Sequence, residues 1–155
     1  MSDLLVRLYA LPPRPPAELA DGTSIRRALG PEKGVVSAWV ARTFNTHWAS
    51  ECEMGFGGQP VSCWIAVRDN RLIGFACHDG TAKGFFGPTG VDPEERGKGI
   101  GDALLMSTLW GMRDAGYGYA IIGDPGPVAF YTKRLDAIEI PNSKPGVYAG
   151  LLPRI

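Results

Sequence analysis

The feature that most constrains this chain is the alternation of Gly97, Gly99 and Gly101 directly before an apolar segment with helical spacing. Glycine adopts backbone angles closed to other residues and places no side chain in the path of a ligand. Where such a loop begins a helix, free amides and the helix dipole favour a bound anion. Arg96 and Lys98 add full positive charges. The loop therefore predicts a phosphate site, although a glycine-rich turn that only starts a helix has the same sequence pattern.

Two common phosphate motifs do not fit these residues. A P-loop needs Ser or Thr directly after its Gly-Lys pair, whereas Gly99 follows Lys98. A dinucleotide fingerprint needs Gly-x-Gly-x-x-Gly, whereas the spacing from Gly97 is Gly-x-Gly-x-Gly. Asp102 adds an acid that suits the helix dipole but repels a phosphate. The loop belongs to neither motif.

The order Arg96-x-x-Gly99-x-Gly101, after a predicted strand that ends at Val91, resembles the coenzyme A loop of the GNAT superfamily of acyl-CoA-dependent N-acyltransferases. A second match, Phe130-Tyr131-Thr132-Lys133, resembles the Phe-Tyr-x-Lys helix that follows the next strand in that family. Two motifs in this order, separated by a helix and a strand, are more specific than either one alone. The diagnostic motifs lie within residues 83–135, and the order of elements is similar from about residue 23 onward.

The resemblance implies an α/β (α+β) fold, with a mixed central sheet of six to seven strands flanked by four helices. Residues 1–155 are of a size for one domain, and residues 1–22 are expected to form a strand or arm and a proline-rich connector. The implied cosubstrate is acetyl-CoA (coenzyme A), with no metal. By this resemblance, the cofactor-binding residues are Thr89, Gly90, Val91, Arg96, Gly97, Lys98, Gly99, Ile100, Gly101 and Asp124.

The resemblance also implies direct transfer in a ternary complex, in which a neutral amine attacks the thioester and coenzyme A leaves as a thiolate. Tyr131 matches the family's catalytic acid. An unperturbed pKa of ~10 keeps its hydroxyl protonated at neutral pH, so it can donate a proton to the departing sulfur. For a general base the sequence offers Glu53, Glu51, His47 or a chain of water. Many family members carry asparagine where Asp124 stands, and a carboxylate only accepts hydrogen bonds.

These residues predict an N-acyltransferase that moves an acetyl group from acetyl-CoA to a primary amine of a small molecule or peptide. The alternative is a non-catalytic acyl-CoA-binding module or sensor, which Asp124 and the absence of an assigned base favour. A nucleotide or phosphosugar enzyme with the same anion loop is a further alternative. The amine and the acyl chain length stay open, because residues 31–60 and 136–150 carry no diagnostic motif.

The composition limits which binding partners and which cellular compartment are expected. Sixteen basic and sixteen acidic residues leave no basic field for nucleic acid or an anionic membrane. No run approaches the ~20 apolar residues of a membrane span, and the first ten residues lack a signal-peptide core. Cys52, Cys63 and Cys77 lack Cys-x-x-Cys spacing, which argues against a disulfide framework or a zinc site. We expect a soluble cytoplasmic protein, and a homodimer stays open because family members often dimerise.

Periodicity and turn residues predict the order of elements. The predicted segments are a strand or arm at 4–9, an extended surface connector or docking peptide at 12–16, a strand at 23–29, helices at 31–44 and 46–54, a hairpin at 61–67 and 72–77, a glycine-containing strand at 83–91, a helix from 100 to near 116, a strand buried on both faces at 117–123, a helix after 127, and a closing strand pair at 138–140 and 147–152.

Three local predictions concern these strands. The glycines at 84, 87 and 90 and Pro88 indicate a bulge or a close backbone approach. A two-residue turn at Asp69-Asn70 would place Cys63 opposite Ala76, whereas a three-residue loop would place it opposite Cys77. His78 beside Asp79 is favoured as a solvated turn, and a base with its orienting acid is the alternative.

Overall fold

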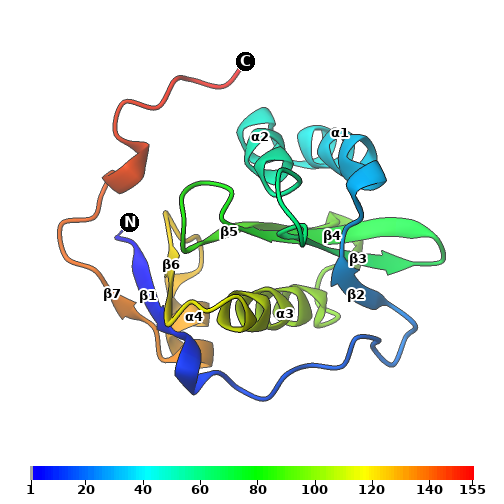
Figure 1. The fold of residues 1–155 in the computed structure, drawn as a ribbon, viewed down its shortest axis with the longest axis horizontal. Helices are drawn as coiled ribbons and strands as arrows, with labels where there is room; N and C mark the ends of the chain where they lie inside the picture. The colour runs from blue at the N-terminus through cyan, green and yellow to red at the C-terminus, as the bar shows by residue number, and fades with distance from the viewer. Residues whose placement is uncertain (1) are drawn as a thin grey trace.

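The computed structural model describes residues 2–155 and contains one mixed sheet of seven strands in the order β2-β3-β4-β5-β6-β1-β7 (Figure 1). The strands are β1 (Leu4–Arg7), β2 (Ser24–Arg27), β3 (Cys63–Arg68), β4 (Arg71–His78), β5 (Phe85–Val91), β6 (Tyr119–Ile122) and β7 (Ile138–Glu139). The α-helices are α1 (Lys33–Thr43), α2 (Thr46–Met54), α3 (Ile100–Asp114) and α4 (Val128–Leu135). This confirms the predicted fold class.

The helices cover the two faces of the sheet in pairs, with α1 and α2 on one face and α3 and α4 on the other (Figure 1). On α3, Ile100, Leu104 and Leu109 are at most 1% exposed and belong to the larger core cluster. Each such burial stabilises the fold by roughly 1.5–3 kcal/mol. α3 is therefore fixed firmly against the sheet. Within residues 2–155, every helix falls short of the length and apolarity that crossing a membrane requires.

The N-terminal segment is a true strand of the sheet. β1 lies between β6 and β7 and pairs antiparallel with both, with Leu4 opposite Ile122 and Glu139. The neighbouring β6 is buried on one face only, since Ala120 is fully buried whereas Tyr119 is 51% exposed. The prediction of burial on both faces was wrong, because α1 and α2 lie over β3 to β5 and leave this part of the sheet uncovered (Figure 1).

The proline-rich connector crosses the surface of α3 and carries the chain from β1 to the edge strand β2 (Figure 1). Its backbone is held where the Trp110 Nε1 atom donates to the carbonyl oxygen of Pro12 at 3.0 Å. Arg14 donates two hydrogen bonds of 2.9 Å to the carboxylate of Asp114. These contacts fit the predicted surface connector.

The predicted closing strand pair is wrong in its second half. Only Ile138–Glu139 forms a strand, Gly146–Tyr148 is a 3-10 turn, and residues 149–155 have no regular structure. Gly146 and Gly150 have φ angles of 62° and 78°, which break an extended ladder. A short apolar run without a strand partner does not form a strand, and periodicity alone cannot show whether a partner exists.

The β3–β4 hairpin has the predicted turn but not the predicted register. Asp69 and Asn70 have φ angles of 51° and 60°, and Arg68 pairs with Arg71 across a two-residue loop. Val67 then pairs with Leu72 and Ala66 with Gly74, so β4 contains one extra residue. This bulge places Cys63 opposite Cys77 instead of Ala76.

Candidate functional site

The site is built where β5 and β6 separate. These parallel strands pair only at Phe85–Ile121 and Phe86–Ile122, after which residues 87–91 of β5 continue without a β6 partner. Against β4, Ala76 pairs with Thr89 and His78 with Phe86, which leaves an extra residue on β5. The predicted bulge is confirmed. Backbone groups on the β6 side of residues 87–91 are therefore available to a ligand.

The glycine loop lies directly beyond β5 and begins α3. Gly97 and Gly99 have φ angles of 80° and 82°, and a Cβ atom on either would have no heavy atom within 4 Å. Gly99 occupies the N-cap position, where no side chain caps the amides of α3. The 15 residues of α3 add a dipole whose positive end lies at this loop. The arrangement is a helix N-terminus that can receive an anion.

A cavity of about 350 Å³ joins the glycine loop to the separated strand. It contains eight of the ten predicted cofactor-binding residues. Its lining residues are Phe44, Trp48, Thr89, Gly90, Val91, Glu95, Arg96, Gly97, Gly99, Ile100 and Gly101. Lys98 and Asp124 are not part of this lining.

Neighbouring ion pairs adjust the charge of the loop. Glu95 accepts hydrogen bonds from Arg68 at 2.6 Å and from Lys98 at 2.8 Å. These bonds lower the pKa of Glu95 to about 2, and the bond from Arg68 has the larger effect. Lys98 thus neutralises an acid. Asp102, which would repel a phosphate, accepts from Arg134 at 2.7 Å and 3.2 Å. Arg96 lines the cavity and is exposed, so its positive charge is available there.

Two aromatic residues of the cavity wall were not predicted. Phe44 follows α1 and Trp48 lies on α2, and their ring centroids are 5.1 Å apart. Both rings also lie near Phe75, at 5.8 Å and 6.2 Å. In the sequence, Phe44 falls on a helical apolar stripe, which indicates core packing, and Trp48 is favoured as a packing residue over a wall of the acceptor site. No local signal distinguishes a core aromatic residue from one that is also exposed to a cavity.

Tyr131 and Asp124 both come after β6 in the chain. Tyr131 of α4 is 7% exposed, and burial raises the pKa of its hydroxyl. Its ring makes an edge contact of 5.3 Å with the more exposed Phe130. Asp124 follows β6 with a φ angle of 45°, and its backbone N–H donates to the Asp3 Oδ1 atom at 3.3 Å.

The three base candidates occupy different environments on α2. Glu51 is partly buried and accepts from the hydroxyl of Thr81, and burial raises the pKa of the Glu51 carboxyl. Glu53 is exposed and accepts from the Ser37 hydroxyl at 2.8 Å. The charge of His47 acts on Glu51, although less than burial does. The raised pKa of Glu51 is a feature that active-site acids and bases often share.

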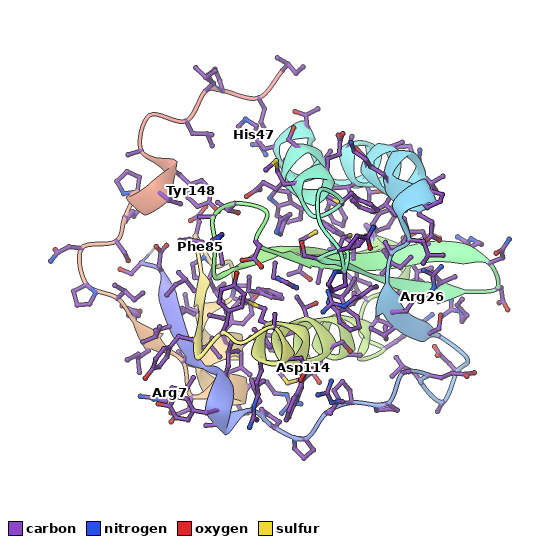
Figure 2. The ribbon with its side chains drawn as sticks, viewed as in Figure 1. Arg7, Arg26, His47, Phe85, Asp114 and Tyr148 are labelled. Carbon is purple, nitrogen blue, oxygen red and sulfur yellow. The ribbon has the colours of Figure 1, made fainter. Side chains whose placement is uncertain are left out.

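Glu51 belongs to an acidic region around Tyr148. Burial raises the pKa of Tyr148, and the charges of Glu51, Asp124 and Asp3 raise it further. A Cβ atom on Gly123 would lie 3.1 Å from Phe85 and 3.3 Å from Tyr148. Figure 2 shows Tyr148 beside Phe85, below His47 of α2. The region lies at the end of the sheet where β5 and β6 begin to separate.

His78 and Asp79 do not form a solvated turn. His78 is 4% exposed, and its Nδ1 atom lies 2.7 Å from the Asp79 Oδ2 atom. Asp79 also accepts from the Tyr117 hydroxyl at 2.8 Å and from the Gly84 backbone at 2.7 Å. Burial lowers the pKa of His78. The prediction of a solvated turn was wrong, because His78 is buried and Asp79 is held by Tyr117 and by the backbone of Gly84.

The fold and the cavity define the class of protein. A strand separation beside a helix-opening glycine loop is a site for an elongated ligand with a phosphate group. Residues 59–134 match the family model described as acetyltransferase (GNAT) domain. Through these residues the chain belongs to the GNAT superfamily. No curated protein matches the chain.

Solved structures share the fold at low sequence identity. A glucosamine N-acetyltransferase region of a fungal multi-domain β-N-acetylglucosaminidase aligns with a TM-score of 0.71 and 19% identity, over 90% of this chain and 19% of that one. A GCN5-related N-acetyltransferase from Sphaerobacter thermophilus aligns with a TM-score of 0.68 and 20% identity, over 90% of this chain and 48% of that one. A GNAT family acetyltransferase from Brucella melitensis, in complex with acetyl-CoA, aligns with a TM-score of 0.59 and 17% identity, over 87% of this chain and 92% of that one. The chain thus spans less than half of the first two relatives.

Proposed function

We propose that residues 1–155 form one acyltransferase domain that moves an acetyl group from acetyl-CoA to a primary amine of a small molecule or peptide. The observation that carries this proposal is a cavity of about 350 Å³, which joins a bare helix N-terminus to a segment of β5 that has no partner on the β6 side. A phosphate-containing ligand with an amide-bearing arm matches both parts. Coenzyme A has this composition, and the acetyl-CoA complex of the Brucella melitensis relative supports it.

In the proposed complex, the amides after Gly97 and Gly99 and the guanidinium of Arg96 bind the pyrophosphate. The pantetheine arm pairs with the backbone of Thr89, Gly90 and Val91. Hydrogen bonds from charged groups contribute about 1.5–3 kcal/mol each, so Arg96 is the largest single side-chain contribution. Fixing the cosubstrate in this way converts a bimolecular encounter into an oriented reaction.

The proposed chemistry is direct transfer. A neutral amine attacks the thioester carbon, a backbone amide near Val91 stabilises the oxyanion, and the C–S bond then breaks. Tyr131 gives its proton to the leaving sulfur, and its raised pKa keeps the hydroxyl protonated above neutral pH. Glu51 takes a proton from the amine, since burial raises its pKa toward the working range of a general base.

The acidic region supports an acceptor that carries positive charge before it reacts. Asp3, Glu51 and Asp124 all act on Tyr148, at the end of the sheet where the acetyl group would lie. A field of this sign attracts ammonium groups and repels carboxylates. Small amines and basic peptide N-termini are therefore the proposed substrates.

One observation favours the alternative of a non-catalytic acyl-CoA-binding module. Tyr131 and Asp124 are outside the lining of the cavity, so the cavity by itself accounts for binding and not for turnover. The two functions differ in a single measurable quantity, which is the thiol released per cosubstrate bound.

The test combines calorimetry with a thiol-release assay. Acetyl-CoA is titrated into the wild type and into Arg96→Ala, and release of free coenzyme A is followed over polyamines, aminoglycosides, amino acids and peptides. Binding that Arg96→Ala weakens, together with release on at least one cationic amine, supports the transferase. Binding without release on any amine supports the module. Preference for ATP over coenzyme A would contradict both.

A further inference from the structure

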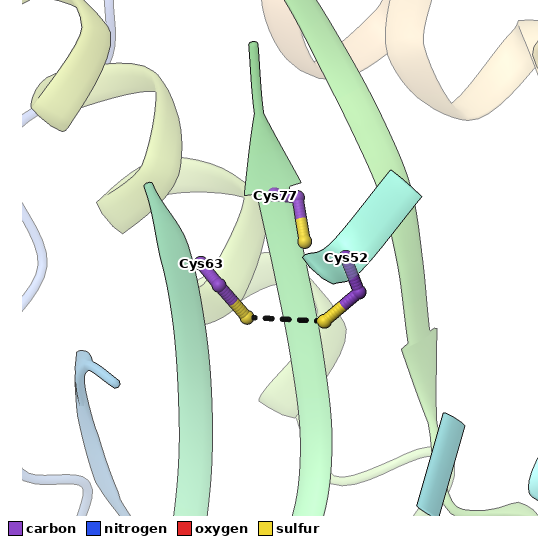
Figure 3. Close-up of side chains that lie close together, drawn as sticks. All are labelled: Cys52, Cys63 and Cys77. Carbon is purple, nitrogen blue, oxygen red and sulfur yellow. Dashed lines mark hydrogen bonds between the residues drawn. The ribbon is translucent and has the colours of Figure 1, made fainter. Parts of the chain in front are cut away.

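Three cysteines that are far apart in sequence meet inside the protein (Figure 3). Cys52 comes from α2, Cys63 from β3 and Cys77 from β4. Their Sγ atoms all lie within 4.8 Å of one another, and those of Cys52 and Cys63 are 3.6 Å apart. Each residue is 0% exposed and each thiol is free. The chain contains no other cysteine.

The fold creates this cluster through two features that the sequence did not reveal. The bulge in β4 sets Cys63 directly opposite Cys77 on neighbouring strands. α2 then covers the same face and places Cys52 over the pair (Figure 3). The spacing of 11 and 14 residues matches no common metal motif, which is why the sequence argued against a metal site.

The surroundings determine which kind of ion fits. The cluster lies in the apolar core beneath α1 and α2, together with Val61, Ile65 and Phe75. Within residues 2–155, the group contains no fourth His, Cys, Asp or Glu. Structural zinc almost always takes four ligands. Soft thiolate ligands favour Cu(I), which is a closed-shell ion without a need for a fourth ligand.

The distances are compatible with a central ion. Three atoms within 4.8 Å of one another lie at most about 2.8 Å from a common centre, whereas a metal–thiolate bond measures about 2.3 Å. Three sulfurs bound at this length would lie about 4.0 Å from one another. The 3.6 Å between Cys52 and Cys63 would widen slightly and any longer separation, up to 4.8 Å, would shorten, so shifts of less than about 1 Å would complete a three-coordinate site.

We propose that Cys52, Cys63 and Cys77 form a three-thiol site for a soft monovalent metal ion, Cu(I). Each cysteine that binds as a thiolate forms one S–Cu bond and releases one proton to solvent, and copper keeps its oxidation state throughout. The proposal is independent of the transferase activity. Its structural consequence is that the ion joins α2 to β3 and β4, one turn after Trp48 of the cavity wall.

The test is a Cu(I) competition experiment under anaerobic, reducing conditions. The wild type is titrated against the Cu(I) complex of bicinchoninate, with the thiolate-to-copper absorption and the thermal midpoint as further readouts. Cys52→Ala, Cys63→Ala and Cys77→Ala each remove one ligand. Val61→Ala removes apolar volume from the same core cluster and leaves all three thiols, so it controls for lost packing.

We expect one Cu(I) per chain, a raised thermal midpoint, and an affinity lowered ~100-fold or more by each cysteine variant, because even outer-shell losses cost 10–100-fold. Val61→Ala should keep wild-type affinity. Where a cysteine variant does not fold, copper X-ray absorption of the wild type decides, and three sulfur neighbours are expected. Failure of the wild type to compete, unchanged affinity in a cysteine variant, or tighter binding of Zn(II) than of Cu(I) would each overturn the proposal.

Discussion

Phe44 covers Gly90 so closely that a Cβ atom on Gly90 would lie 2.4 Å from the ring atom Cζ of Phe44. Gly90 is part of β5 at the cavity, and Phe44 forms the cavity wall together with Trp48. The glycine is thus needed for close packing of an aromatic ring and not only for access by a ligand. This contact joins the end of α1 to β5.

Replacing Gly90 by alanine should displace Phe44, which lowers the free energy of unfolding by about 1–3 kcal/mol and raises the KM for acetyl-CoA. Urea unfolding and steady-state kinetics measure the two effects. Gly34→Ala on α1 is the matched control, because a Cβ atom there meets nothing within 4 Å. Equal stability of both variants would show that the ring moves freely.

Arg96 and Lys98 should differ in their effect on cosubstrate binding although both lie in the loop. Arg96→Ala removes the charge that faces the cavity, and we expect a Kd for coenzyme A raised by ~10-fold or more. Lys98→Ala removes a partner of Glu95 and should change the Kd by less than ~3-fold. Calorimetry at two salt concentrations measures both, and the reverse order would reject the charge assignment.

Tyr131→Phe should lower kcat by ~10²-fold or more and leave the Kd for acetyl-CoA nearly unchanged, because only the proton donor is lost. Pre-steady-state thiol release and calorimetry separate the two quantities. Phe130→Leu, which changes the exposed neighbour of Tyr131, serves as control. A variant with the wild-type rate would exclude Tyr131 as the acid.

Glu51 should define the acidic limb of the rate profile. A base must be ionised, so kcat/KM falls as pH falls through the pKa of Glu51, which burial has raised above 4.5. Glu51→Gln should lower kcat by ~10²–10⁴-fold and remove this limb. The exposed Glu53, changed to Gln, should have little effect. The same pH profile in wild type and Glu51→Gln would assign the limb to another group.

His78 should make the fold less stable in mild acid. Burial lowers its pKa in the folded state, so the unfolded state binds more protons below the ordinary value of 6.5. The contribution of neutral His78 to the free energy of unfolding is therefore fully present above pH 6.5. It is lost as pH falls below 6.5, by at most ~1.4 kcal/mol per pH unit.

Urea unfolding between pH 7.5 and 5.5 measures this slope. His78→Gln removes the titration and should give a flatter profile than the wild type. Glu51, whose pKa is raised in the folded state, acts in the opposite direction where it titrates. The difference between the two proteins, and not either slope alone, therefore reports His78. A His78→Gln profile parallel to that of the wild type would contradict the assignment.

The sequence was sufficient for features that depend on local chemistry. Glycines before an apolar helical pattern identified the loop at Gly97–Gly101 and the start of α3, because few residues other than glycine adopt φ angles near 80°. Glycines and Pro88 likewise indicated the bulge in β5. The match of Arg96 and Tyr131 to two ordered motifs gave the family, which residues 59–134 support.

The tertiary structure decided what depends on partners distant in sequence. A single bulge moved Cys77 opposite Cys63, although the turn itself was predicted correctly. The packing of α2 on the sheet then brought the thiol of Cys52 onto the pair. Burial, which no local pattern reports, distinguished Glu51 from Glu53 and enclosed His78. The sequence by itself determined the loop, the helices and the family, because these rest on backbone preferences of neighbouring residues. Only the packed structure determined the register, the cavity wall and the thiol cluster, because these rest on which surfaces meet.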